Sequence, residues 1–316
     1  MSARHGIETY AGRRQQRGAA LVLALSLLAV FSMLGTYYLQ SMQLAVDTNT
    51  LSIRSVRAHE AAVAGIEAAI GGLYTGLQED QLHLILGKER EIVFPVYKGV
   101  VNGETHGIEA ENRFENKAVL SIEDESGRVN LNHAPASVLQ SLLGIDGETA
   151  RKLASSLPHA GGEAGLVWLV HPDELVSRGF LSEAAYAALD KTLLTTSSVA
   201  AHDTPAPYLN VNSASSAVLA ALLGVPLQKA EELRAQRPYK TLEALAQAAG
   251  ADLGALSMAP MLRTDSQCFR IRSTGVIGRS GGAGDQVSAT LEAVVLFDGL
   301  GAHRVVSWTQ IPTGSA

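Results

Sequence analysis

Residues 17–39 read RGAALVLALSLLAVFSMLGTYYL, and this stretch decides the fold of the chain. No charged residue occurs from Gly18 to Val46. A helix over Ala19–Leu39 reaches about 31 Å, which is the thickness of the hydrocarbon core of a bilayer. The residues ahead of it carry four positive charges and one negative charge: Arg4, Arg13, Arg14, Arg17 and Glu8. The positive-inside rule therefore predicts a single membrane span with a cytoplasmic N-terminus and the rest of the chain exported.

The start of the apolar stretch allows two kinds of processing. A secretory signal peptide has an apolar region of about 7 to 15 residues followed by a small-x-small cleavage site. Here the apolar run is longer, and no Ala-x-Ala site follows it promptly. The alternative is a cut on the cytoplasmic side, between Gly18 and Ala19, which leaves the apolar helix on the mature protein.

Beyond Asp47 the helical pattern continues without a proline as far as Pro95, but it becomes one-sided. Apolar residues recur at spacings of three and four with charged residues between them: Ile53, Val56, Val63, Ile66, Ile70 and Leu73 against Arg54, Arg57, Glu60 and Glu67. We expect one helix of about 50 residues whose second half is amphipathic. An anchor followed by a separate helix is the alternative, because glycines at 35, 65, 71 and 72 can break a helix.

Short β-type runs flank a long helical region. We expect three or four strands between Gly87 and Glu123 and three more after Asp265, over Glu91–Val96, Gly99–Val101, His106–Glu111, Lys117–Ile122, Phe269–Ser273, Val287–Phe297 and Arg304–Thr309. A flexible loop is expected at Gly278–Gly284. Strands before and after a helical block predict an α+β fold, in which an all-α domain is inserted into one antiparallel sheet.

The helical block contains an internal repeat. Asn130-Leu131-Asn132-His133-Ala134 is matched 80 positions later by Asn210-Val211-Asn212-Ser213-Ala214, and the agreement extends to Val138, Leu139, Leu142, Leu143 and Gly144 against Val218, Leu219, Leu222, Leu223 and Gly224. Such agreement at one offset indicates a duplicated helix-hairpin-helix unit. We expect the asparagines 130, 132, 210 and 212 to be structural caps and the two glycines to permit left-handed turns. Further helices are expected over Asp173–Arg178, Ser182–Leu194 and Thr241–Ala249.

Sequence patterns for catalysis are absent. His59-Glu60 lacks the second histidine of a zinc-protease motif, no Cys-x-x-Cys is present, and no phosphate-binding glycine loop precedes a helix. We therefore expect neither enzyme activity nor a cofactor. The acidic clusters Glu123-Asp124-Glu125 and Asp173-Glu174 offer oxygen ligands that suit calcium, but most such clusters are solvated surface, so metal binding stays open. The single cysteine, Cys268, excludes an intrachain disulfide and is expected to be a small buried residue.

The second hairpin raises the question of nucleic-acid binding. Residues 208–245 resemble the helix-hairpin-helix of competence-type DNA receptors, which hold phosphate through the backbone N–H groups of a Gly-x-Gly turn. The corresponding turns are Gly144-Ile145-Asp146 and Gly224-Val225-Pro226; an aspartate repels phosphate, and a proline has no N–H to give. Residues 123–265 contain 16 acidic and 10 basic residues, a net charge of −6, although Arg234, Arg237 and Lys240 form a basic rim. We therefore do not expect DNA binding.

These features together resemble the K-type minor pseudopilins of bacterial type II secretion systems, the general secretion pathway protein K family. The resemblance rests on a basic leader ending at Arg17-Gly18-Ala19, the apolar helix, and a duplicated Asn-x-Asn helical block ahead of C-terminal strands such as Phe269–Gly278. It implies five segments: a prepilin leader at 1–18, a transmembrane and amphipathic pilin helix at 19–75, a pilin-like α/β part at 76–127, an inserted helical domain with SAM-like units at 128–265, and the last strands of the pilin-like sheet at 266–316.

The resemblance also implies that the protein is processed. Prepilin peptidase would cut after Gly18, and Ala19, where this family often has a larger residue, would be N-methylated. The fifth mature residue is then Leu23, where most pilins carry a glutamate that pairs with the N-terminus of a neighbouring subunit. A subunit at the tip of a filament has no neighbour above it, and this family typically lacks that glutamate.

The function implied by the resemblance is structural. The protein would span the bacterial inner membrane once, with its bulk in the periplasm in contact with the secretion platform, the other minor pseudopilins and the major pseudopilin. At the tip of the pseudopilus it would initiate or cap assembly and help to export folded proteins through the outer membrane. A minor pilin of a type IV pilus and a membrane-anchored DNA receptor are the alternatives.

Overall fold

The computed structural model describes residues 5–78, 86, 89–94, 100–101, 104–105, 114–157, 168–197, 209–252, 254, 261–279, 286–298 and 302–312. The chain forms two compact units, Met1–Val56 and Arg57–Ala316. A long N-terminal helix, an antiparallel sheet and a set of shorter helices confirm the expected α+β fold.

The N-terminal helix α1 runs without a break from His5 to Gln78. A single helix is thus confirmed, and the alternative of an anchor followed by a separate helix is wrong, because an isolated glycine costs a helix only about 1 kcal/mol. Every side chain from Leu21 to Ile53 is exposed. By length and composition α1 qualifies as a membrane span, with a mean hydropathy of 1.9 in its apolar window.

Five strands form one antiparallel sheet in the order β1-β4-β9-β10-β11. Their bounds are Arg90–Phe94, Phe114–Asp124, Cys268–Arg279, Val287–Phe297 and His303–Ile311. The last three confirm the strands expected after Asp265, and β10 has the expected ends. A separate hairpin joins β2 (Val100–Val101) to β3 (Glu104–Thr105). The strand expected over His106–Glu111 lies outside the described residues.

Two strands that are distant in sequence lie side by side at the centre of the sheet. β4 pairs with β9 along its whole length, from Phe114↔Arg279 to Asp124↔Phe269. The chain thus leaves the sheet at Asp124 and returns to it at Cys268, so the helical region is an insertion. The expected loop does not begin at Gly278, because this residue pairs with Glu115 and β9 continues to Arg279. The rest of that expected loop, residues 280–284, lies outside the described residues.

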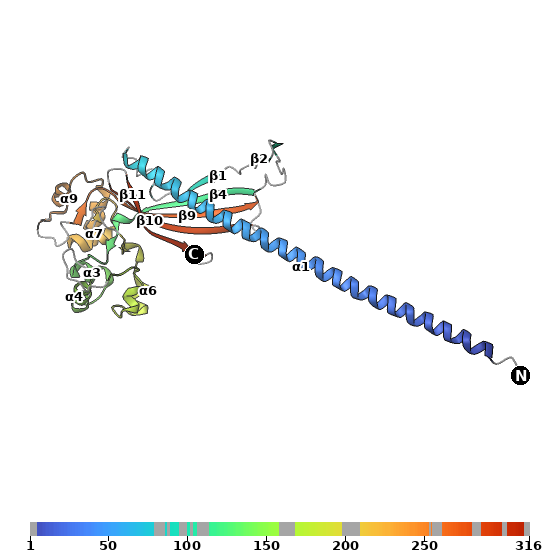
Figure 1. Ribbon diagram of the computed structural model, residues 1–316. Coiled ribbons are helices and arrows are strands. Elements are labelled where there is room, and N and C mark those ends of the chain that lie inside the picture. Colours follow the sequence, from blue (N-terminus) through green and yellow to red (C-terminus); the bar gives the residue numbers. More distant parts are fainter. Residues whose placement is uncertain are drawn as a thin grey trace. The chain divides into compact units, whose positions relative to one another are not determined.

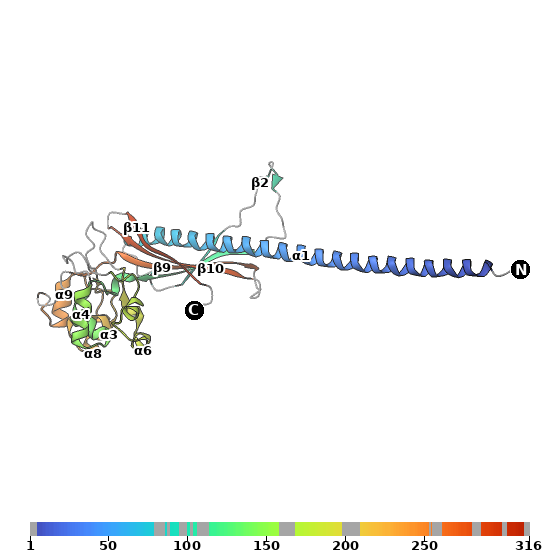
Figure 2. The same ribbon diagram turned by 60° about the horizontal axis from the view of Figure 1, so that its bottom comes forward.

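The last part of α1, from Arg57 to Gln78, packs on one face of this sheet (Figures 1 and 2). Their common core consists of Ala62, Ile66, Ala69, Ile70, Leu73, Ala118, Leu120, Ile122, Phe269, Ile271, Leu291, Ala293, Val295 and Phe297. Small residues allow a close approach: a Cβ on Gly275 would lie 1.9 Å from the carbonyl oxygen of Ala58, and a Cβ on Gly65 would lie 2.3 Å from Ser273 Oγ. The apolar residues that alternate along the strands and those that recur along one side of the helix thus form one apolar layer.

The insertion is a duplicated helical unit beyond one end of the sheet (Figure 1). The first copy contains η2 (Glu125–Gly127), β5 (Val129–Asn130), α3 (Ala136–Leu143), α4 (Gly147–Ser156), α5 (Glu174–Ser177), α6 (Glu183–Ala188), η3 (Lys191–Leu193) and β6 (Leu194–Thr195). The second contains β7 (Leu209–Asn210), α7 (Ser216–Leu223), α8 (Leu227–Ala235), α9 (Leu242–Ala249) and β8 (Leu262–Arg263). One hydrophobic core, which includes Leu139 and Leu219, runs through both.

Short parallel strand pairs close each copy, β5 with β6 and β7 with β8. The sequence pattern does not predict these pairs, since each strand has only two residues. The helix expected over Ser182–Leu194 is wrong in its second half, because α6 ends at Ala188 and the chain then turns into β6.

The close contact between α1 and β9 predicts a large effect of one methyl group. We expect Gly275→Ala to lower the free energy of unfolding by about 3 kcal/mol, because the added Cβ meets the backbone of the helix. The matched control is Gly71→Ala in α1, where a Cβ meets nothing within 4 Å and should stabilise the helix by about 0.5–1 kcal/mol. Denaturant unfolding of the full chain in detergent measures both. Equal effects would contradict this packing.

Candidate functional site

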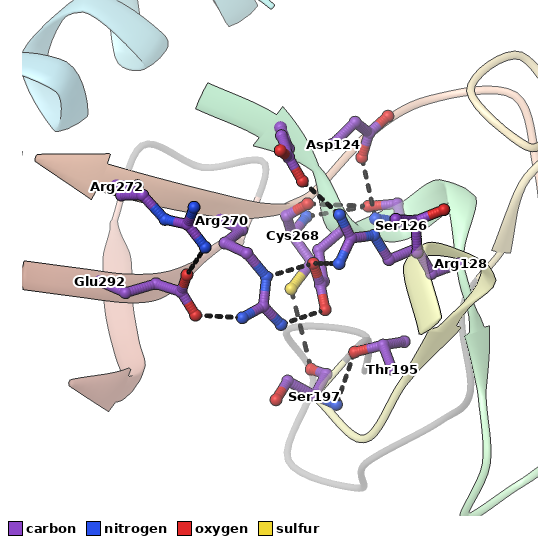
Figure 3. Close-up of polar contacts among 12 residues, drawn as sticks. Asp124, Ser126, Arg128, Thr195, Ser197, Cys268, Arg270, Arg272 and Glu292 are labelled. Atoms are coloured by element: carbon purple, nitrogen blue, oxygen red, sulfur yellow. Dashed lines mark hydrogen bonds and ion pairs between the residues drawn. The ribbon is translucent and has the colours of Figure 1, made fainter. Parts of the chain in front are cut away.

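Many polar contacts gather at the neck, which we define as residues 124–128 and 266–270, where the insertion leaves and rejoins the sheet (Figure 3). Ser126 Oγ accepts the backbone N–H of Cys268 at 3.0 Å and that of Gln267 at 3.3 Å, and it donates to the Cys268 carbonyl at 3.3 Å. Ser266 donates its hydroxyl to Asp124. These bonds close the insertion at its base.

Glu125 supplies the charge at the centre of the neck, and its side chain is fully buried. Arg270 approaches it with two nitrogens, Nε at 2.9 Å and Nη2 at 2.6 Å, and Arg128 Nη1 lies 3.3 Å away. Burial alone would raise the pKa of Glu125, but the two guanidinium groups outweigh burial and hold that pKa below its ordinary value. The carboxylate is therefore charged in the folded protein.

The series of ion pairs continues from the neck across the sheet. Arg270 also pairs with Glu292 on β10, whose second oxygen accepts from Arg272 Nη2 at 3.0 Å. Burial opposes the charge of Arg270, but its two carboxylate partners raise its pKa above the ordinary value. Arg128, Glu125, Arg270, Glu292 and Arg272 thus form one alternating row that links η2 to β9 and β10. Figure 3 labels the three arginines and Glu292 of this row.

The pKa of Asp124 shifts in the opposite direction to that of Glu125. Burial raises its pKa, and the hydrogen bonds from Ser213, Ser266 and Ser126 only partly offset this. No arginine pairs with Asp124 among the described residues, so a proton on this carboxyl group is stabilised in the folded state. Cys268 is fully buried beside it, and burial raises the pKa of its thiol well above the ordinary value.

The acidic clusters that suggest calcium are already engaged. Glu123 pairs with Arg128, and Glu125 with Arg128 and Arg270. Glu174 accepts the backbone N–H groups of Val170 and His171 and pairs with Arg178; these contacts, the Arg178 hydrogen bond foremost, lower its pKa to about 2. Within the described part of the chain, no group of three or more His, Cys, Asp or Glu side chains is placed to hold a metal ion.

The asparagines of the repeat act as clamps between loops. Asn132 accepts the N–H of Leu169 at 2.8 Å and donates to the carbonyl of the same residue at 2.9 Å. Asn212 makes the same two bonds to Tyr239, at 2.8 and 2.9 Å, and a third to the Thr264 carbonyl at 2.8 Å. Each copy therefore uses its second asparagine to bind the loop that leads into its third helix.

The expected capping role of these asparagines is corrected by this geometry. The N-cap residues are Pro135 for α3 and Ser215 for α7. Asn130 and Asn210 instead accept the N–H of the residue two positions on, at 3.0 and 2.8 Å, and so hold a local turn. Asn132 and Asn212 lie three positions ahead of these N-cap residues, and their side chains bond to Leu169 and Tyr239 instead.

The two hairpin turns have the backbone geometry that glycine permits. Gly144 and Gly224 are the C-cap residues of α3 and α7, each with φ of 64°. The donors after the first turn are occupied, because Asp146 accepts the N–H groups of Glu148 and Thr149, both at 2.9 Å. A phosphate would compete with this carboxylate for the same N–H groups.

The basic rim of the second copy is partly internal. Arg237 donates from Nη2 to the Ala214 carbonyl, and burial together with the nearby Arg234 lowers its pKa to about 10. The guanidinium group thus holds the loop before α7 rather than facing an external polyanion.

One cavity is missed entirely by sequence reasoning. A cleft of about 500 Å³ lies between β11 and the loop at 168–173, with Arg128 and Arg270 of the neck and Glu292 of β10 also in its lining. We call it the β11 cleft. Its walls come from segments more than 100 residues apart, for example Trp168 and Val306, so no local pattern announces it.

The residues expected to be processed lie in the other unit. Gly18 and Ala19 fall within α1, and Leu23 is 64% exposed on that helix. They belong to Met1–Val56 and are not part of the neck or the repeat.

Comparison with solved structures places this geometry among known folds. A chain in the crystal structure of the GspK-GspI-GspJ complex from the enterotoxigenic Escherichia coli type 2 secretion system matches 83% of this chain and 100% of its own length, with a TM-score of 0.53 and 15% identity. The chain has a GspK-like fold. The chain matches no protein-family model, and no curated protein is significantly similar to it. At 15% identity, this structural similarity shows the fold alone.

The clamp predicts a stability effect. Asn132→Ala should lower the free energy of unfolding by about 3 kcal/mol, because the buried N–H and carbonyl of Leu169 lose their partner. Ser137→Ala on the exposed side of α3 is the control and should change it by less than about 0.5 kcal/mol. Denaturant unfolding followed by tryptophan fluorescence measures both, and a small effect of the asparagine variant would contradict the clamp.

The neck predicts a pH-dependent effect. Glu125→Gln should cost about 3 kcal/mol at neutral pH, because it removes the buried charge that two partly buried guanidinium groups face. Since the folded pKa lies below the ordinary 4.5, this stabilisation is present above pH 4.5 and is lost as the pH falls through the folded pKa. The difference between wild type and variant should therefore shrink on acidification.

The control for the neck is Glu123→Gln, whose carboxylate is half exposed and pairs with the same Arg128. It should cost no more than about 1 kcal/mol. Unfolding titrations at several pH values measure the three proteins. A difference for Glu125→Gln that grows on acidification would show that the buried carboxylate is not held in its charged form.

Proposed function

We propose that this protein is a minor pseudopilin of a bacterial type II secretion system and acts at the tip of the pseudopilus. The observation that carries the proposal is the joining, on one chain, of an apolar helix long enough to span a bilayer to a body with a GspK-like fold. The neighbouring structure is a complex with two other components of such a system. By analogy, the partners of this chain are other minor pseudopilins and the major pseudopilin.

The membrane anchor is the N-terminal part of α1. Its exposed apolar surface extends all around the helix, for example at Leu28, Phe31 and Met33, which suits a lipid environment and not water. The positive charges lie ahead of this surface, which supports a cytoplasmic N-terminus and a periplasmic body. The anchor crosses the bacterial inner membrane once. In that membrane the protein meets prepilin peptidase and the secretion platform.

Processing between Gly18 and Ala19 gives a mature chain that begins with the apolar helix and is N-methylated at Ala19. Leu23 is then the fifth residue. A carboxylate in lipid is costly without a partner, so a subunit with no neighbour above it is better served by leucine. The helical insertion supports the same position, because a bulky domain beyond the sheet suits the end of a filament.

The role we propose is structural, not catalytic. The polar side chains that the neck gathers are committed to one another: Glu125 to two arginines, Glu292 to two arginines, and Ser126 to the backbone of β9. Such saturation suits a scaffold that holds its shape, since a reacting group needs free lone pairs or protons. The protein would initiate or cap the pseudopilus and so help folded proteins to cross the outer membrane.

Cleavage at the leader tests this function. When the full chain is co-expressed with prepilin peptidase, intact-mass analysis of the membrane fraction should find a chain that starts at Ala19. Gly18→Val should abolish the cut, because the peptidase must accept a small residue there, whereas Gly12→Val in the same leader should not. A full-length chain under all conditions, or a cut after Leu39, would contradict the proposal.

A further inference from the structure

The strand β11 is an edge of the sheet with an unusual amount of exposed apolar surface. It pairs with β10 on one side, and no other strand of the described sheet adjoins it. Val305, Val306 and Trp308 are 41%, 39% and 42% exposed. An edge strand of this kind offers unpaired backbone N–H and carbonyl groups to another chain.

The opposite edge shows how this sheet protects a strand from pairing. β1 has five residues, its Glu91 pairs with Lys117 at 3.0 Å, and Pro95 follows directly. Short length, charge and proline all oppose the addition of a further strand. β11 has nine residues, contains no proline, lysine or acidic residue, and carries one arginine near its start.

A bulge divides β11 but leaves its second half regular. The register shifts between Val294 and Val295 of β10, so Val306 has no residue opposite it. From Ser307 to Ile311 the pairing with β10 is continuous, ending at Thr290↔Ile311. The outer edge of Ser307–Ile311 therefore offers regularly spaced backbone groups with which an extended segment can pair.

The β11 cleft lies beside this edge. Val306, Ser307 and Thr309 form its wall on the strand, and Trp168 and Val170, which are 44% and 70% exposed, line the side of the insertion. Its volume of about 500 Å³ has room for a large apolar side chain with space for its backbone. In strand addition the main-chain bonds give affinity and such a pocket gives selectivity.

Charge favours an acidic occupant. Lys191 lines the cleft with its Nζ 4.4 Å from the ring centre of Tyr186, and Arg304 is exposed on β11. The ion pairs found among the described residues give neither of them a carboxylate, whereas Arg270 and Arg272 already share Glu292. Two carboxylates also line the cleft, but Asp173 accepts the hydroxyl of Tyr186 and Glu292 is shared by two arginines. Lys191 and Arg304 are therefore the cations that a carboxylate on the incoming chain would complement.

We propose that β11 is a docking edge, along which an extended segment of another pseudopilin subunit adds as a sixth strand at Ser307–Ile311. An apolar side chain of that segment enters the β11 cleft, and an acidic residue next to it faces Lys191 or Arg304. This inference rests on the proposed function for the kind of partner. It adds a surface and a mode of recognition that the anchor helix does not provide.

Photo-crosslinking from three positions tests the docking edge. Benzoylphenylalanine is placed at Thr309 on β11, at Val93 on β1 and at Leu28 on α1, in the full chain co-expressed in membranes with the other minor pseudopilins of its system. We expect crosslinks to a pseudopilin from Thr309 and Leu28 and at least a tenfold weaker signal from Val93. Mass spectrometry should map the Thr309 product to an extended, acidic and apolar segment of that partner.

The outcomes separate this inference from the proposed function. Crosslinks from Leu28 without one from Thr309 would overturn the docking edge and leave the pseudopilin function standing. A Thr309 product with a second copy of this chain would also overturn it, and the absence of crosslinks at all positions would overturn both. As a second readout, Thr309→Lys should lower co-purification of the partner at least fivefold, whereas Val93→Lys, also at an exposed position but on β1, should not.

Discussion

The buried charge of Glu125 is the constraint on which the arrangement of the insertion depends. A carboxylate without solvent is costly unless cations remain beside it, so Arg128 and Arg270 must stay in place whenever the protein is folded. One of these arginines begins the insertion and the other belongs to β9 of the sheet. The ion pair and the Ser126 hydrogen bonds therefore hold the two ends of a long insertion together at one point.

Two apolar cores lie on either side of this polar neck. One core lies between the last part of α1 and the sheet, where glycines at 65 and 275 let the backbones approach closely. The other runs through both copies of the helical repeat. The neck lies where the two cores meet, which explains why its charges are matched and its hydroxyl groups are bonded. A protein built in this way can present the insertion and the β11 edge as fixed surfaces.

Local patterns in the sequence predict the elements that local physics determines. The apolar run predicts α1, the β-branched run at 287–297 predicts β10 with its ends, and glycine after Leu-Leu predicts the left-handed turns at 144 and 224. The neck and the clamps escape prediction because they join distant residues: Ser126 and Cys268 are 142 apart, and Asn132 and Leu169 are 37 apart. An asparagine before a helix suggests a cap, and only the fold reveals that a loop takes its hydrogen bonds.

The central claim is that the neck binds the insertion and the sheet into one cooperative unit. The chain has two tryptophans, Trp168 in the insertion and Trp308 on β11, so each part carries its own fluorescent probe. The direct measurement is denaturant unfolding of Trp168→Phe and Trp308→Phe, each reporting through the tryptophan that remains. The account predicts the same unfolding midpoint and slope from both probes, once the effect of each substitution on stability is corrected by circular dichroism. Two separate transitions, with the insertion unfolding before the sheet, would contradict it.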